Sequence, residues 1–65
     1  MRMLSHKDLV ELKGIKFSRQ HIHRLIAANK FPRPVKLGEN TNAWPEPEVD
    51  KYLEERVKAR DSVLA

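Results

Sequence analysis

Residues 18–38, SRQHIHRLIAANKFPRPVKLG, decide the fold of this 65-residue chain. The first half predicts a helix, because Ile22, Leu25 and Ile26 recur on one helical face. Ser18 precedes them at a position where its hydroxyl can cap the helix. Two prolines then forbid a continuing helix, and the residues after them alternate as a short strand. The stretch therefore predicts a short helix that leads directly into a β-hairpin.

Another short helix is expected before this stretch. Ser5 can cap it, the helix would run over about residues 6–13, and Gly14 would end it in the left-handed conformation. Two short helices that are joined by a few residues including glycine, the second with a polar and basic face, are the sequence form of a helix-turn-helix.

The hairpin and a third helix complete the predicted order. Residues 35–37 and 43–44 are expected to be the strands, with turn residues over 38–42. Pro47 suits the first position of the third helix, which we expect to end near Arg60. The predicted fold class is a small, mostly helical α+β protein: a winged helix-turn-helix with the order helix, helix, β-hairpin, helix.

A single winged helix-turn-helix domain is expected to occupy residues 1–65, ordered over about residues 3–60 and frayed over residues 61–65. Its apolar core is thin, and Trp44 should be the largest single contributor to it. The expected core residues are Leu4, Leu9, Val10, Phe17, Ile22, Leu25, Ile26, Phe31, Val35, Trp44, Val49, Tyr52, Leu53 and Val57.

The charge of the chain is unevenly distributed. The formal net charge is +4 and the sequence pI is about 9.8, which fits a polyanionic partner. Residues 13–36 contain seven basic residues and no acidic one, whereas all nine acidic residues lie outside this window. The alternative is a solvated surface of mixed charge, but this segregation gives the molecule a basic side and favours a nucleic-acid partner.

Several classes of function lack the residues that they need. Cysteine is absent, and His6, His21 and His23 do not have a metal-ligand spacing, so no metal site is expected. Because there is no nucleophile–base pair and no glycine-rich phosphate loop, we expect no catalytic residue, no cofactor, no small-molecule ligand and no enzymatic activity. No apolar run could span a bilayer and no signal peptide follows Met1, which favours a cytoplasmic protein without membrane contact.

The polar face of the second helix carries the candidate contacts to base pairs. Arg24 could bind a guanine edge or clamp a phosphate, and Gln20 could pair with adenine. Arg19 lies in the first turn, where it can reach a phosphate or a base even though a cation there is slightly unfavourable. His23 could donate to a base or a phosphate, and His21, nearer the core edge, has a poorer angle. For each side chain the alternative is an ordinary packing or solvent residue.

Five further residues are candidate contacts to the DNA backbone or the minor groove. Ser18 is first a helix cap, and its hydroxyl can also reach a phosphate. Lys30, Arg33 and Lys36 would contact phosphates if the hairpin lies along the minor groove, and would otherwise serve solubility. Asn40 would serve the turn first, with a minor-groove contact as the less favoured interpretation.

A series of short motifs runs over about residues 3–60. They are Leu12-Lys13-Gly14, Ser18-Arg19, Ile22-His23-Arg24-Leu25-Ile26, FPRPVKLG over residues 31–38, Ala43-Trp44 and Glu48-Val49. With this series the chain resembles the AlpA family of phage and integrative-element regulators, small winged-helix proteins related to excisionases and to the DNA-binding domain of MerR regulators. The FPRPVKLG segment and the tryptophan after it are the specific part, since a helix-turn-helix alone is a weak signal.

The resemblance implies sequence-specific binding to double-stranded DNA in a bacterial mobile element. Such proteins activate an integrase promoter or, as directionality factors, bend attachment-site DNA for excision. The implied partners are DNA, further copies of the chain in a cooperative array, and an integrase. Family members commonly carry Thr and Tyr in place of His21 and His23, and often Arg in place of Asn40, so the DNA-reading face would differ here. The runner-up function is a winged-helix adaptor or inhibitor that binds a regulatory protein.

Overall fold

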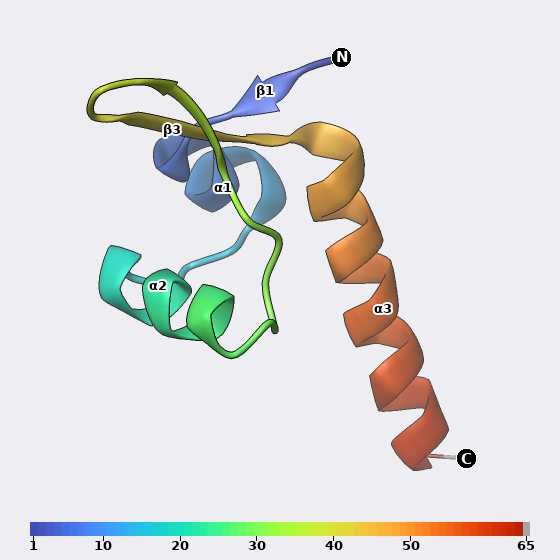
Figure 1. The fold of residues 1–65 in the computed structure, drawn as a ribbon. Helices are drawn as coiled ribbons and strands as arrows, with labels where there is room; N and C mark the ends of the chain where they lie inside the picture. Colours follow the sequence, from blue (N-terminus) through green and yellow to red (C-terminus); the bar gives the residue numbers. More distant parts are fainter. Residues whose placement is uncertain (65) are drawn as a thin grey trace.

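The computed structural model describes residues 1–64. Its elements are, in order, β1 (Met3–Leu4), α1 (His6–Lys13), α2 (Arg19–Ala27), β2 (Val35–Gly38), β3 (Thr41–Pro45) and α3 (Glu46–Leu64). In Figure 1, α1 lies beneath the hairpin, α2 lies below α1, and α3 leaves the end of β3 and runs away from the sheet. The predicted fold class is confirmed: α1 and α2 form the helix-turn-helix, and the β2–β3 hairpin is the wing.

The helix α1 begins at a capping box and ends at a glycine. The Ser5 hydroxyl accepts a 3.1 Å hydrogen bond from the Asp8 amide, and the Asp8 carboxylate accepts one of 3.1 Å from the Ser5 amide. Gly14 has a φ of 69°, a left-handed value that costs other residues about 1–2 kcal/mol. The helix predicted over residues 6–13 is confirmed.

The helix α2 is also fixed at both ends. The Ser18 hydroxyl accepts a 3.1 Å hydrogen bond from the His21 amide, as the sequence predicts. At the other end Asn29 takes a left-handed φ of 58°, and the Lys30 amide donates to the Leu25 carbonyl at 2.8 Å. This is a Schellman motif. Asn29 therefore ends the helix.

The turn between α1 and α2 packs against the core. Ile15, which the sequence placed only in a turn, is 6% exposed, and its amide donates to the Leu9 carbonyl at 3.0 Å. The ring nitrogen Nε2 of His6 donates to the Phe17 carbonyl at 3.0 Å. These contacts hold α2 in a fixed orientation relative to α1.

Three strands form an antiparallel sheet in the order β1-β3-β2. The two-residue strand β1, too short to show a period, pairs Leu4 with Trp44, and the wing pairs Lys36 with Asn42. Directly opposed residues share a face, as do alternate residues along a strand, so all four side chains lie on one face of the sheet. This face is apolar over the core, at Leu4 and Trp44, and becomes polar along the wing.

The turn of the wing is shorter than predicted. Gly38 pairs with Thr41, so only residues 39–40 form the turn, whereas the sequence suggested residues 38–42. The register shifts between β2 and β3 leave Leu37 in a bulge. A bulge of this kind increases the local twist and re-aims the side chains at the tip.

The core joins all three helices to the sheet. Its buried members are Leu4, Leu9, Ile15, Ile22, Phe31, Trp44 and Val49, with Phe17, Leu25, Ile26, Tyr52 and Leu53 packed against them. Trp44 is 5% exposed, its ring lies edge-on to Phe31 at 6.0 Å between centroids, and its Nε1 donates to the Pro32 carbonyl at 2.8 Å. Trp44 is therefore a core residue, as predicted, and also ties the segment before the wing to the sheet.

Three predicted core residues are wrong. Val10 is only half-buried and is not among the residues that form or pack against the core. Val35 is 43% exposed because it lies on the edge strand β2, whereas its partner Ala43, on the same face of the central strand β3, is buried. Val57 is 48% exposed, because it lies two turns beyond Val49, where α3 has left the core. The periodicity of a helix or strand identifies which face is apolar. It does not show how many residues of that face are covered by other parts of the fold.

The helix α3 is longer than predicted. It begins at Glu46, so Pro47 occupies its second position, and it continues to Leu64 instead of ending near Arg60. Its first turns pack against the core, and its last turns extend past the other elements in Figure 1. The predicted frayed tail over residues 61–65 includes Ala65, which lies outside the described residues.

Lys13 links α1 to the start of α3. Its Nζ lies 2.8 Å from a carboxylate oxygen of Asp50 and 3.0 Å from one of Glu46. These hydrogen bonds, with Asp50 the larger cause, raise the pKa of Lys13 above its ordinary value of 10.5. The pair of acidic residues fixes the direction in which α3 leaves the sheet.

Replacing Lys13 with methionine should lower the melting temperature at neutral pH. A raised pKa means that the folded state holds the proton more tightly, so the stabilisation is complete below pH 10.5 and is lost as the pH rises through the folded-state value. Thermal melts of both proteins from neutral to strongly alkaline pH measure this. A difference in melting temperature that persists unchanged above that range would contradict the assignment.

Candidate nucleic-acid interface

The outward face of α2 is polar and exposed. Successive residues turn by about 100° around the helix, so with Ile22 and its apolar neighbours against the core, Gln20 and Arg24 point away from it. They lie one turn apart, and both are exposed. Ala27 continues the same face with a small side chain. A surface of this shape can approach base edges in a major groove without steric obstruction.

A groove, here called the wing groove, separates α2 from the wing and has a volume of about 290 Å³. Arg19 and His23 line it from α2, and Asn40, Thr41 and Asn42 line it from the tip of the wing. The structure therefore brings three of the predicted contact residues, Arg19, His23 and Asn40, to a single site.

The third wall of the wing groove comes from the beginning of α1. Ser5, His6 and Lys7 line it there, and Ile22 and Trp44 are among its apolar lining residues. No sequence pattern marked Lys7, because its position at this site depends on how the wing folds over the helix-turn-helix.

Lys36 lies beside the wing groove. It is directly opposite Asn42 in the hairpin, so the two side chains share a face of the sheet, and both are exposed. Glu39 is exposed in the turn and is the one acidic residue between residues 12 and 45. Glu39 does not line the wing groove, so its carboxylate disfavours a phosphate beside the turn but not one that lies within the groove.

The other predicted contacts lie elsewhere. The ring of His21 is half-buried and lies edge-on to Phe17, with 4.7 Å between ring centroids, so packing accounts for it. The Ser18 hydroxyl is engaged in the cap of α2. Arg33 is exposed in the connection between α2 and β2, outside the wing groove, and Lys30 lines a different cleft.

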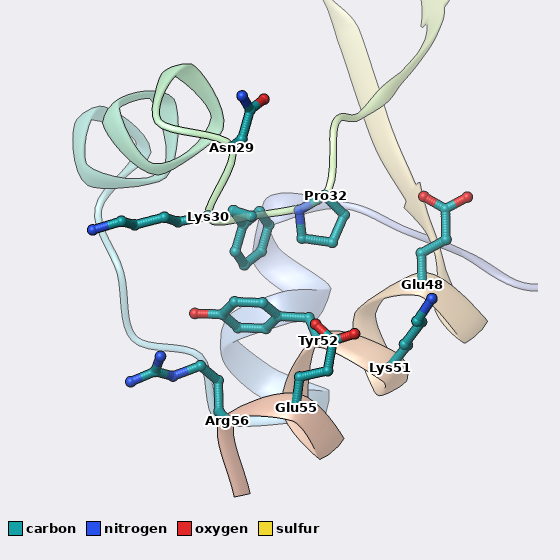
Figure 2. Close-up of a pocket in the computed structure, with 9 residues that line it drawn as sticks. Asn29, Lys30, Pro32, Glu48, Lys51, Tyr52, Glu55 and Arg56 are labelled. Carbon is teal, nitrogen blue, oxygen red and sulfur yellow. The ribbon is translucent and has the colours of Figure 1, made fainter. Parts of the chain in front are cut away.

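That second site, here called the aromatic cleft, lies between the end of α2 and α3 and has a volume of about 550 Å³ (Figure 2). Phe31 and Tyr52 line it as an edge-on pair with 4.8 Å between ring centroids. Its rim carries both signs of charge, from Lys30, Glu48, Lys51, Glu55 and Arg56. It shares no lining residue with the wing groove.

The ion pairs explain which basic residues remain available. Among the residues whose side chains the structure describes, Lys13 and Arg60 form ion pairs with carboxylates, and no other lysine or arginine does. Lys13 therefore adds little to the positive charge that residues 13–36 present to a partner, because Glu46 and Asp50 of α3 pair with it. Arg19 and Arg24 are exposed and form no ion pair with the described side chains.

Comparisons with known proteins assign the family. The sequence model of the family described as "Prophage CP4-57 regulatory protein (AlpA)" matches residues 2–57, which is most of the chain. No curated protein and no solved structure shows significant similarity to this chain. No helix within residues 1–64 is both long enough and apolar enough to cross a membrane. The chain belongs to the AlpA family of prophage regulatory proteins.

Proposed function

We propose that this protein is a sequence-specific DNA-binding regulator of a prophage or integrative element. The observation that carries the proposal is the outward face of α2, where Gln20 and Arg24 are exposed and one turn apart, and where Arg24 has no carboxylate partner within the described part of the chain. In this arrangement α2 enters the major groove, the wing follows the backbone or the adjacent minor groove, and α3 supports both.

The side chains divide into base-reading and backbone contacts. Arg24 binds a guanine edge and Gln20 an adenine edge, each with two hydrogen bonds. Arg19, His23 and Lys36 border the wing groove, where they fix the position of the protein on the DNA backbone. Asn40 also lines the wing groove. Ser18, His21, Lys30 and Arg33 lie outside the groove and complete the proposed set as peripheral contacts.

Membership of a family of prophage regulatory proteins supports the regulatory role. We propose that the protein acts on the promoter of an integrase or directs excision as a recombination directionality factor. A single module makes few phosphate contacts and therefore binds weakly alone. We infer cooperative binding of several copies to repeated sites, and contact with an integrase when excision is directed.

The alternative is an adaptor or inhibitor that docks on a regulatory protein. The aromatic cleft supports it, since the partly exposed ring of Tyr52, packed on the buried Phe31 within a rim of mixed charge, can accept a peptide segment. The reading face of α2 would then have no role in binding. DNA binding and its salt dependence separate the two functions.

A titration of isotope-labelled protein with duplex DNA, followed by amide NMR shifts, tests the proposal. We expect binding that weakens roughly 100-fold between about 50 and 200 mM salt if four phosphates are contacted. An adaptor would show no salt-sensitive binding to DNA. The same titration on mixed-sequence DNA and on DNA flanking the gene measures the specificity ratio.

A further inference from the structure

The wing groove draws its donors from three elements that are distant in the sequence. Lys7 comes from α1, Arg19 from α2, and Asn40 and Asn42 from the wing tip. Among the residues that the structure describes, no aspartate or glutamate lines the groove. A concave site with two cations and several neutral donors, but with no carboxylate side chain among its described lining residues, suits an anion with many acceptor oxygens.

The size and lining of the wing groove narrow the class of ligand. Its volume of about 290 Å³ is at the lower end of the range for ligand pockets, so it admits one sugar–phosphate unit and excludes a helix or a strand. Ile22 and Trp44 provide apolar lining surface against which a sugar ring can pack. The base-reading face of α2 borders the groove, since Arg19 and His23 line it on one side and Gln20 and Arg24 point outward.

We propose that the wing groove seats one sugar–phosphate segment of the DNA strand that runs between α2 and the wing. Lys7 and Arg19 bind its phosphate, and Asn40 and Asn42 donate to it from the wing. The inference rests on the proposed function and adds Lys7, outside the helix-turn-helix reading face, as the residue that fixes the register of α2 on the duplex.

Because this contact is to the backbone, Lys7→Gln should weaken binding by the same factor on cognate and mixed-sequence duplexes. The slope of log affinity against log salt should become shallower by about 0.9, which corresponds to roughly 8-fold at 0.1 M salt. Lys7→Arg should restore both the affinity and the slope. Lys7 is exposed, so a thermal melt should show an unchanged fold.

The matched control is Lys51→Gln, which removes the same charge from an exposed lysine of α3 that lines the aromatic cleft instead. It should leave the slope unchanged. An unchanged salt slope for Lys7→Gln, or equal changes of slope in the two variants, would contradict the proposed phosphate contact in the wing groove. Neither result would contradict DNA binding as such. A wild-type protein without any DNA binding overturns both this inference and the proposed function.

A competition experiment shows whether the wing groove binds the phosphate of a DNA backbone or a free phosphate ion. Inorganic phosphate, compared with chloride at equal ionic strength, should displace no more DNA than chloride does, because the seat uses a phosphate held in place by the duplex. Selective displacement by low millimolar phosphate would make the groove a free-anion site and overturn the proposal.

Discussion

Replacing Trp44 with alanine should leave the chain largely unfolded at 37 °C. Removing a buried tryptophan costs about 3–5 kcal/mol, and a domain of 65 residues has about 3–10 kcal/mol of stability in total. The loss is large here because Trp44 is 5% exposed and also holds the Pro32 carbonyl through its Nε1. Far-ultraviolet circular dichroism during heating measures the effect.

Two variants control this result. Trp44→Phe keeps an aromatic ring but removes the 2.8 Å hydrogen bond to Pro32, so it should cost less, about 1–3 kcal/mol. Val57→Ala should change the stability by less than about 0.5 kcal/mol, because Val57 is 48% exposed. A Trp44→Ala protein that melts within a few degrees of the wild type would show that the core is built differently.

Replacing Arg24 with alanine should weaken binding to cognate DNA by about 1–3 kcal/mol, or roughly 5- to 150-fold. Arg24 is exposed and pairs with no carboxylate among the residues described by the structure, so the fold should be unchanged and the loss should lie in binding. Anisotropy titrations on cognate and mixed-sequence duplexes measure it. The loss should be larger on the cognate duplex, because a guanine contact contributes only there.

Arg56→Ala is the matched control for Arg24, since it removes an exposed arginine from α3, outside the wing groove. It should leave the specificity ratio unchanged. Equal losses on both duplexes would make Arg24 a phosphate contact, and unchanged cognate binding would remove it from the interface.

Local signals made the helix ends and the fold class predictable from the sequence. Ser5, Gly14 and Ser18 act through hydrogen bonds and backbone angles within a few residues, and the structure shows all three in the predicted roles. The spacing of Ile22 and Leu25 likewise gave the correct buried face of α2. Such features depend little on the rest of the molecule.

Long-range pairing accounts for what the sequence did not reveal. The strand β1 has two residues and exists because Leu4 pairs with Trp44, forty positions later. The sequence places Lys13 in the basic stretch over residues 13–36, and only the fold of α3 brings Asp50 beside it. Lys7 reached the wing groove only through the fold of the hairpin. None of these pairings leaves a periodic trace in the sequence.

The amide shifts of labelled protein during titration with cognate duplex locate the DNA-binding surface most directly. DNA binding through the face of α2 and the wing predicts that the perturbed amides cluster over residues 19–24 and 36–42, with a smaller group near Lys7. The amide shifts of residues 46–60 in α3 should not change. Shift changes concentrated around the aromatic cleft and α3, or no shift changes at any salt concentration, would contradict DNA binding through α2 and the wing.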